Sequence, residues 1–180
     1  GNLSYHLPVG AKKINTLSAG VQVGIVNKSF DPSKLTFDNQ YNPDAGYDPN
    51  ISSGEEFSNT NVTRPDVNVG LSWQRGWLKK DVRFKPLLSV AYSHITQPDE
   101  TFIMDVTKSI AKTTLYGGFG YLIKDQLELR PTFMMLHQGP HKETTFGTLL
   151  NYQFDNKNSV QLGAYHRMED AVIAYAGYQM

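Results

Sequence analysis

Apolar side chains alternate with small or polar ones along residues 14–26, and this two-residue period limits the possible folds more than any other feature of the chain. Leu17, Val21 and Ile25 fall on one face of an extended chain, whereas Ser18 and Gln22 fall on the other. This alternation predicts a β-strand with one apolar face and one small, polar face. A face of bare aliphatic side chains meets either a protein core or lipid, and the rest of the sequence has to distinguish the two.

The same period recurs along most of the chain, and residues typical of tight turns separate several of the repeats. Residues 124–126 and 155–158 carry the Asp, Asn and Lys composition of hairpin turns. Eight further strands are expected at residues 1–9, 66–73, 86–95, 111–123, 127–136, 144–154, 159–167 and 171–180. Because no helical pattern lies between these segments, we predict an all-β fold of about nine antiparallel strands that run up and down.

The lengths of the connections distinguish a transmembrane barrel from a soluble sandwich. The two longest connections, residues 27–65 and 96–109, fall at one end of the predicted strands, whereas most connections at the other end are tight. Long loops at one end and short turns at the other are typical of outer-membrane barrels, in which the long loops are extracellular. The second face of the strands holds mainly Gly, Ser, Asn and Gln with few charges, such as Glu128 and Arg130, which suits a lumen. We therefore predict a transmembrane β-barrel.

Composition excludes several other classes of protein. The 17 basic residues balance the 17 acidic ones, so the chain has no general basic surface for nucleic acid. It has no cysteine, which excludes a disulfide framework and thiolate metal sites. No stretch approaches the roughly 20 apolar residues of a membrane-spanning helix. Mean hydropathy is −0.41, a value that alternating strands can give.

No group of residues predicts catalysis, a metal or a cofactor. The five histidines are scattered over different strands and loops without the spacing of a ligand pair, and no nucleophile motif is present. Acidic and amide residues between positions 38 and 50 resemble a calcium loop, but their spacing does not fit an EF-hand. Asx turns in a solvated loop explain them better. We expect a protein that is not an enzyme.

The chain is expected to be one domain over residues 1–180, with a long extracellular loop at 27–65. If the turn at 124–126 is periplasmic, the first strand begins outside the cell and the ninth ends in the periplasm. Bacterial barrels normally start on the periplasmic side and have an even number of strands. Strand direction therefore predicts that the domain is incomplete, with at least one strand before Gly1 and more after Met180.

Two groups of residues are candidates for contacts outside the barrel. Aromatic residues near the ends of predicted strands are candidates for a membrane–water girdle: Trp73, Trp77, Tyr92, Tyr121 and Tyr152. Aromatics spread among acids and amides in the 27–65 segment could plug the barrel, bind a partner or pack the loop against the rim. The residues of this candidate partner-binding loop are Phe37, Asp38, Gln40, Tyr41, Asp44, Tyr47 and Asp48.

Several stretches of sequence resemble one known family. They are YHLPVG at 5–10, LSAGVQVG at 17–24, DPSKLTFDNQYNPDAGYDPN at 31–50, RPDVNVGLSW at 64–73 and KPLLSVAYSHI at 85–95. An F-D-x-Q-Y sequence followed by a D-P loop, and then P-D-x-N-x-G-L at the start of the next strand, is the order of motifs in the PorP/SprF family of the type IX secretion system of Bacteroidota. Residues 37–41 and 65–71 stand in those places. The second half of the chain resembles the family more by pattern than by motif.

The resemblance implies an outer-membrane β-barrel that associates with cell-surface adhesins or with the type IX machinery, in protein secretion or gliding motility. It implies no catalytic residues and no cofactor. Two alternatives stay open from the residues alone. A diffusion or ligand-uptake porin would need a charged constriction, for which Glu128 and Arg130 are too few. A soluble β-sandwich binding module would stay monomeric without detergent.

Overall fold

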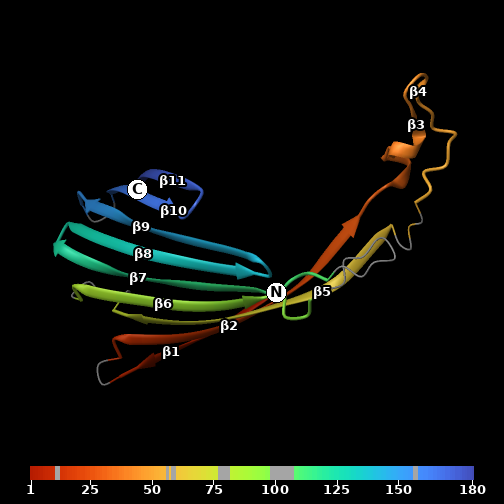
Figure 1. Ribbon diagram of the computed structural model, residues 1–180. Coiled ribbons are helices and arrows are strands. Elements are labelled where there is room, and N and C mark those ends of the chain that lie inside the picture. Colours follow the sequence, from red (N-terminus) through yellow and green to blue (C-terminus); the bar gives the residue numbers. More distant parts are fainter. Residues whose placement is uncertain (11–12, 56, 58–59, 77–81, 98–107, 156–157) are drawn as a thin grey trace. The chain divides into compact units, whose positions relative to one another are not determined.

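The computed structural model describes residues 1–10, 13–55, 57, 60–76, 82–97, 108–155 and 158–180 (Figure 1). Nine strands form one antiparallel sheet in which each strand pairs with the sheet strands before and after it in the chain. They are β1 (Asn2–Val9), β2 (Asn15–Ser29), β5 (Asn61–Arg75), β6 (Phe84–Ser93), β7 (Lys112–Lys124), β8 (Leu127–Gln138), β9 (His141–Gln153), β10 (Ser159–Arg167) and β11 (Ala171–Gln179). The predicted all-β, up-and-down arrangement of about nine strands is confirmed.

The chain divides into two compact units. The sheet unit holds Gly1–Val23, Val67–Ile95 and Ile110–Met180, and the loop unit holds Gly24–Asp66 and Thr96–Ser109. Two short 3-10 helices, η1 (Pro32–Lys34) and η2 (Asp38–Gln40), and a small hairpin of β3 (Tyr41–Asn42) and β4 (Gly46–Tyr47) lie in the loop unit. No helix in the described part of the chain is long and apolar enough to span a bilayer.

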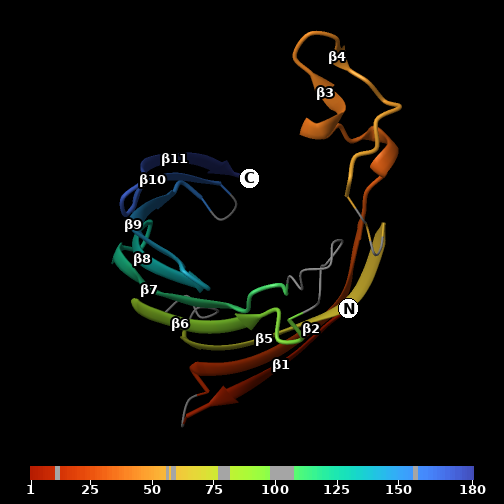
Figure 2. The same ribbon diagram turned by 45° about the vertical axis from the view of Figure 1, so that its right-hand side comes forward.

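The strands of the sheet unit curl into an open arc from β1 to β11, as Figure 2 shows. Directly paired residues lie on the same face of a sheet, so the register sorts the side chains into two faces. The outer face carries pairs such as Trp73 with Leu88 and Phe133 with Phe146. The inner face carries Glu128 opposite Asn151. Outer-face residues are mostly exposed, whereas most inner-face residues are half-buried or buried. The inner face is the concave side of the arc, where side chains crowd one another.

Glycine allows β9 and β10 to pair closely on the inner face. Gly147 of β9 stands opposite Tyr165 of β10. A Cβ atom at Gly147 would lie 2.4 Å from the carbonyl oxygen of Ala164 and 2.6 Å from the Cα of Tyr165. Both are backbone atoms, so only glycine fits this position without moving a strand.

The strands are longer than the alternation alone predicts. Strand β2 continues to Ser29 and β5 begins at Asn61, so the connection between them is shorter than residues 27–65. Polar side chains extend this pairing, because the Asn27 amide donates hydrogen bonds to the side-chain oxygens of Asn61 (2.9 Å) and Thr63 (2.6 Å). The connection between the strands expected at 127–136 and 144–154 contains only Gly139 and Pro140, since β8 continues to Gln138 and β9 already begins at His141.

Candidate functional site

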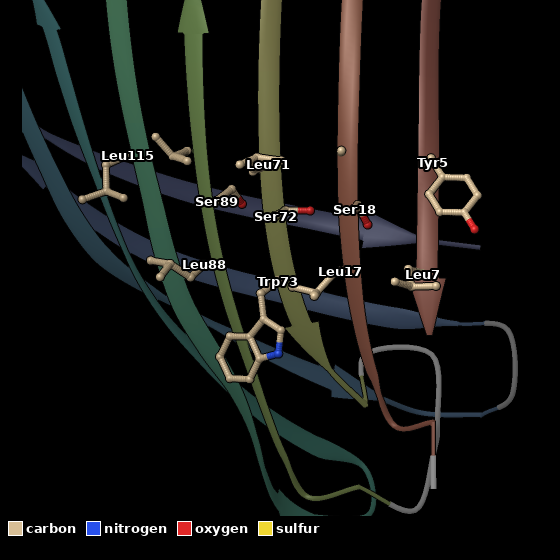
Figure 3. A pocket seen from close by; sticks show the side chains of 12 residues that line it. Tyr5, Leu7, Leu17, Ser18, Leu71, Ser72, Trp73, Leu88, Ser89 and Leu115 are labelled. Atoms are coloured by element: carbon tan, nitrogen blue, oxygen red, sulfur yellow. The ribbon is translucent and has the colours of Figure 1, made fainter. Parts of the chain in front are cut away.

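The outer face of the sheet is apolar and exposed. Leu17, Val21 and Val23 of β2 and Leu71 of β5 are among its exposed side chains. A shallow hollow of about 530 Å³ lies on this face over β1, β2, β5, β6 and β7 (Figure 3). Its lining includes Leu7, Leu17, Leu71, Trp73, Leu88 and Leu115. A continuous apolar surface of this kind needs a cover, such as lipid or another protein.

Three of the candidate girdle residues lie on the outer face near the end of the sheet that carries the tight turns: Trp73, Tyr121 and Tyr152. Tyr92 also lies on the outer face, but near the opposite end of its strand. Trp77 lies outside the described residues. The sequence analysis missed two aromatic contacts at the turn end, in which Phe84 packs against Phe119 at 5.2 Å and Phe154 packs edge-on against Tyr152 at 5.0 Å.

The inner face carries a three-residue charge cluster, Lys85, Glu128 and Arg130, which we call the inner-face triad. The Glu128 side chain is only 7% exposed. Its Oε1 lies 3.5 Å from Nζ of Lys85, and its Oε2 accepts a hydrogen bond from Nε of Arg130 at 3.0 Å. Charged groups that are removed from water in this way are stable only when they are paired, so the three side chains depend on one another.

The inner-face triad spans three strands. Lys85 belongs to β6 and Glu128 to β8, and β7 lies between them. The β7 residue directly opposite Lys85 is Gly120, which has no side chain to block the path of the lysine. Polar side chains at the turn end, including Asn151 and Gln153, join Lys85 and Glu128 in lining a hollow of about 390 Å³. The inner face is therefore polar at this level, in contrast to the outer face.

In the loop unit, residues 30–60, which we call the 30–60 loop, are built around a buried amide. Gln40 is 8% exposed. Its Nε2 donates to the carbonyl of Ile51 at 2.8 Å, and its Oε1 accepts from the backbone N–H of Phe37 at 3.2 Å. Its own carbonyl accepts from the N–H of Asp48 at 2.9 Å. The side chain of Gln40 thus joins the segments at Phe37 and Ile51, and its backbone carbonyl adds the segment at Asp48.

Aromatic and Asx contacts complete the 30–60 loop. The ring of Phe57 packs edge-on against Phe30, with centroids 4.9 Å apart, and lies 6.1 Å from Phe37. The hydroxyl and backbone N–H of Ser33 hydrogen-bond to the Asp31 carboxylate and hold its pKa below the usual value. Asp48 accepts from the backbone N–H of Asn50 in a similar turn. The expected Asx turns are present, and no group of three metal-ligating side chains occurs in the part of the chain that the structure describes.

The seven candidate loop residues fall into two sets. Gln40 is buried and Phe37 is half-buried, so they support the loop from within. Tyr41 and Tyr47 stand directly opposite each other in the β3–β4 hairpin and are 62% and 46% exposed. The remaining candidates are the acids Asp38, Asp44 and Asp48. The candidates at the surface of the loop are therefore two tyrosine rings and three carboxylates that are close to them in the sequence.

Replacing Gln40 with leucine is expected to loosen the 30–60 loop. Leucine fills a similar volume but leaves the Ile51 carbonyl and the Phe37 N–H without their partner, at a cost of about 1–3 kcal/mol for each group that stays buried. Limited proteolysis with an enzyme that cuts after aromatic residues should cleave the variant within the loop faster than the parent. Thr36→Ala, at an exposed position of the same loop, should change the rate little. Equal cleavage of the parent and Gln40→Leu would contradict the supporting role of Gln40.

The sequence analysis missed two of these features. Lys85 lies on the same face of β6 as Ser89 and Ser93, so its face could be predicted from the sequence, whereas its contact with Glu128 across β7 depends on strand pairing. The β3–β4 hairpin has a visible signal, because Pro43, Asp44 and Gly46 are turn-forming residues between two tyrosines.

The comparisons with known proteins agree with this architecture. The family model described as type IX secretion system membrane protein PorP/SprF matches residues 1–180. No curated protein and no solved structure gives a significant match. The match covers the motif-bearing first half and the second half, where the sequence resembled the family only by pattern. The chain therefore belongs to the PorP/SprF family of type IX secretion system membrane proteins.

Proposed function

We propose that this protein is an outer-membrane β-barrel of the type IX secretion system that binds secreted or surface-anchored proteins, adhesins of gliding motility among them. Through this binding it anchors them at the cell surface or helps to export them. Family membership supports a role as a membrane component of the system. The binding role goes beyond that membership and rests on the chain's own surfaces.

The observation that carries the proposal is the ordered 30–60 loop. A loop that served only to connect β2 and β5 would not need a buried glutamine whose side chain and carbonyl together bind three partners, nor an aromatic cluster. Long ordered loops on a rigid scaffold are the usual place for recognition. The exposed apolar outer face supports a position in a bilayer, with Trp73, Tyr121 and Tyr152 as the girdle at the turn end.

Deleting residues 38–60 and joining the ends with a short Gly-Ser linker is the test. We expect the variant to reach the outer membrane, as measured by fractionation, but to lose secretion of type IX substrates or display of surface adhesins. A control variant with the turn at 168–170 replaced by the same linker should behave like the parent. Unchanged secretion and display in the deletion variant would refute the role of the loop. An ion conductance typical of open pores in planar bilayers would instead favour a diffusion porin.

A further inference from the structure

The surface of the 30–60 loop has a chemistry that selects one class of partner. We propose that Tyr41 and Tyr47 form the centre of a docking site for a polypeptide segment that carries Lys or Arg side chains. This inference rests on the proposed function, because it names the partner class for the same loop.

The two tyrosines lie on one face of the β3–β4 hairpin. Residues that pair directly across an antiparallel ladder have Cβ atoms about 4.5–5.5 Å apart on the same face, and Tyr41 pairs directly with Tyr47. Both rings are exposed, while the described ring contacts of the loop join Phe30, Phe37 and Phe57. Tyrosine offers a large contact area with few rotatable bonds and is enriched among the residues that dominate binding energy.

The tyrosine pair is held in place before any partner arrives. Tyr41 follows the buried Gln40 in the chain, and Tyr47 precedes Asp48, whose N–H donates to the carbonyl of Gln40 at 2.9 Å. The same network therefore fixes the backbone beside both rings. A surface that is already ordered loses less conformational freedom on binding, which leaves more of the contact energy for affinity.

The sequence on both sides of the two tyrosines is acidic. Residues 35–63 contain five acidic side chains and no Lys, Arg or His, although the whole chain has equal numbers of acidic and basic residues. Lys34, just before this stretch, pairs with Asp31 at 3.8 Å. The acids are Asp38, Asp44, Asp48, Glu55 and Glu56. A negative surface attracts a positively charged partner and discourages acidic ones. The faces of tyrosine rings also attract Lys and Arg directly.

A lipid surface fits the tyrosine pair poorly. Segments that bind membrane surfaces by charge are rich in Lys and Arg, because lipid headgroups carry negative phosphates. Residues 35–63 have the opposite charge. The exposed tyrosines of β3 and β4 are thus better explained by a protein partner than by adsorption to headgroups.

Binding of a labelled peptide, in which Arg alternates with Gly and Ser, to the detergent-solubilised full chain tests this inference by fluorescence anisotropy. We expect binding that weakens as salt rises, since salt screens exposed charges. A peptide with Glu in place of Arg should not bind. The double variant Tyr41→Ala/Tyr47→Ala should weaken binding about tenfold or more. Asp44→Asn/Asp48→Asn should also weaken it and reduce its dependence on salt.

The control is Tyr178→Ala, which removes a similarly exposed tyrosine from β11 of the sheet and should leave binding unchanged. Tyr41→Phe/Tyr47→Phe should retain most of the binding, because the rings remain. Equal binding of the Arg and Glu peptides, or parent-like binding by the double alanine variant, would overturn the inference. So would anionic lipid vesicles that bind the parent but not that variant.

The two proposals fail separately. If deletion of residues 38–60 abolishes secretion or display while the double alanine variant secretes and displays normally, the role of the tyrosines is wrong and the proposed function stands. If the deletion has no effect, the proposed role of the loop fails, whatever the peptide measurements give.

Discussion

Glu128→Gln should lower the free energy of unfolding by about 3 kcal/mol, the low end of the range for breaking a buried ion pair. The substitution keeps the shape of the side chain but removes the negative charge between Lys85 and Arg130. Lys85 and Arg130 then both lose the carboxylate with which they pair. We expect the low end of the range for the loss of stability because Arg130 is 31% exposed and keeps part of its hydration. Urea unfolding of the protein in detergent micelles or lipid vesicles measures the change.

The matched control for Glu128→Gln is Asp125→Asn, which neutralises a carboxylate at the neighbouring β7–β8 turn. Asp125 pairs with Arg83 at 3.5 Å, but its side chain is 94% exposed. Exposed ion pairs contribute only about 0–1 kcal/mol, so this variant should unfold close to the parent. An equal loss of stability in the two variants would show that burial of the inner-face triad does not determine how much its ion pairs contribute to stability.

Gly147→Ala should destabilise the sheet by about 3 kcal/mol or more, because overpacking against rigid neighbours is costly. The added methyl group would overlap the carbonyl of Ala164 and the Cα of Tyr165, so β10 has to shift away from β9. We expect a smaller folded fraction after refolding into detergent. The difference in gel mobility between heated and unheated samples measures that fraction.

The same substitution at Gly24 is the control for Gly147→Ala. A Cβ atom at Gly24 of β2 meets no other atom within 4 Å. Alanine there should be neutral or stabilise slightly, by up to about 1 kcal/mol, since glycine is costly inside a strand. Equal folded fractions for the two alanine variants would contradict the close approach of β9 and β10.

Much of the sheet could be predicted from the sequence because the strands and their pairing depend on residues that are close together in the chain. Alternation along each strand determines which side chains share a face, and consecutive hairpins make neighbours in sequence neighbours in space. The period alone places Leu17 and Val21 on one face of their strand and separates Glu128 from Leu127 and Leu129, and the loop lengths indicate which face is the outer one. Strand ends were predicted less well, since polar side chains such as Asn27 and Asn61 extend the ladder without any apolar signal.

The inner-face triad and the 30–60 loop were harder to predict because they depend on contacts across strands or on irregular backbone. The ion pair of Lys85 with Glu128 requires the register that brings Gly120 between them. The position of Gln40 inside the loop requires the carbonyl of Ile51, which no sequence period relates to it. Tyr41 and Tyr47 were identified as candidates, whereas their direct pairing follows from the hairpin.

The span of the inner-face triad over three strands also has a consequence for assembly. Lys85 meets Glu128 only when the β6–β7 and β7–β8 pairings both have the native register. A slip of two residues in either pairing keeps every side chain on its proper face, so the apolar pattern alone does not oppose it. Such a slip would move the charges about 6–7 Å apart along the strands. The ion pair therefore stabilises the native register of two successive hairpins. The hydrophobic pattern does not disfavour a two-residue slip in either of them.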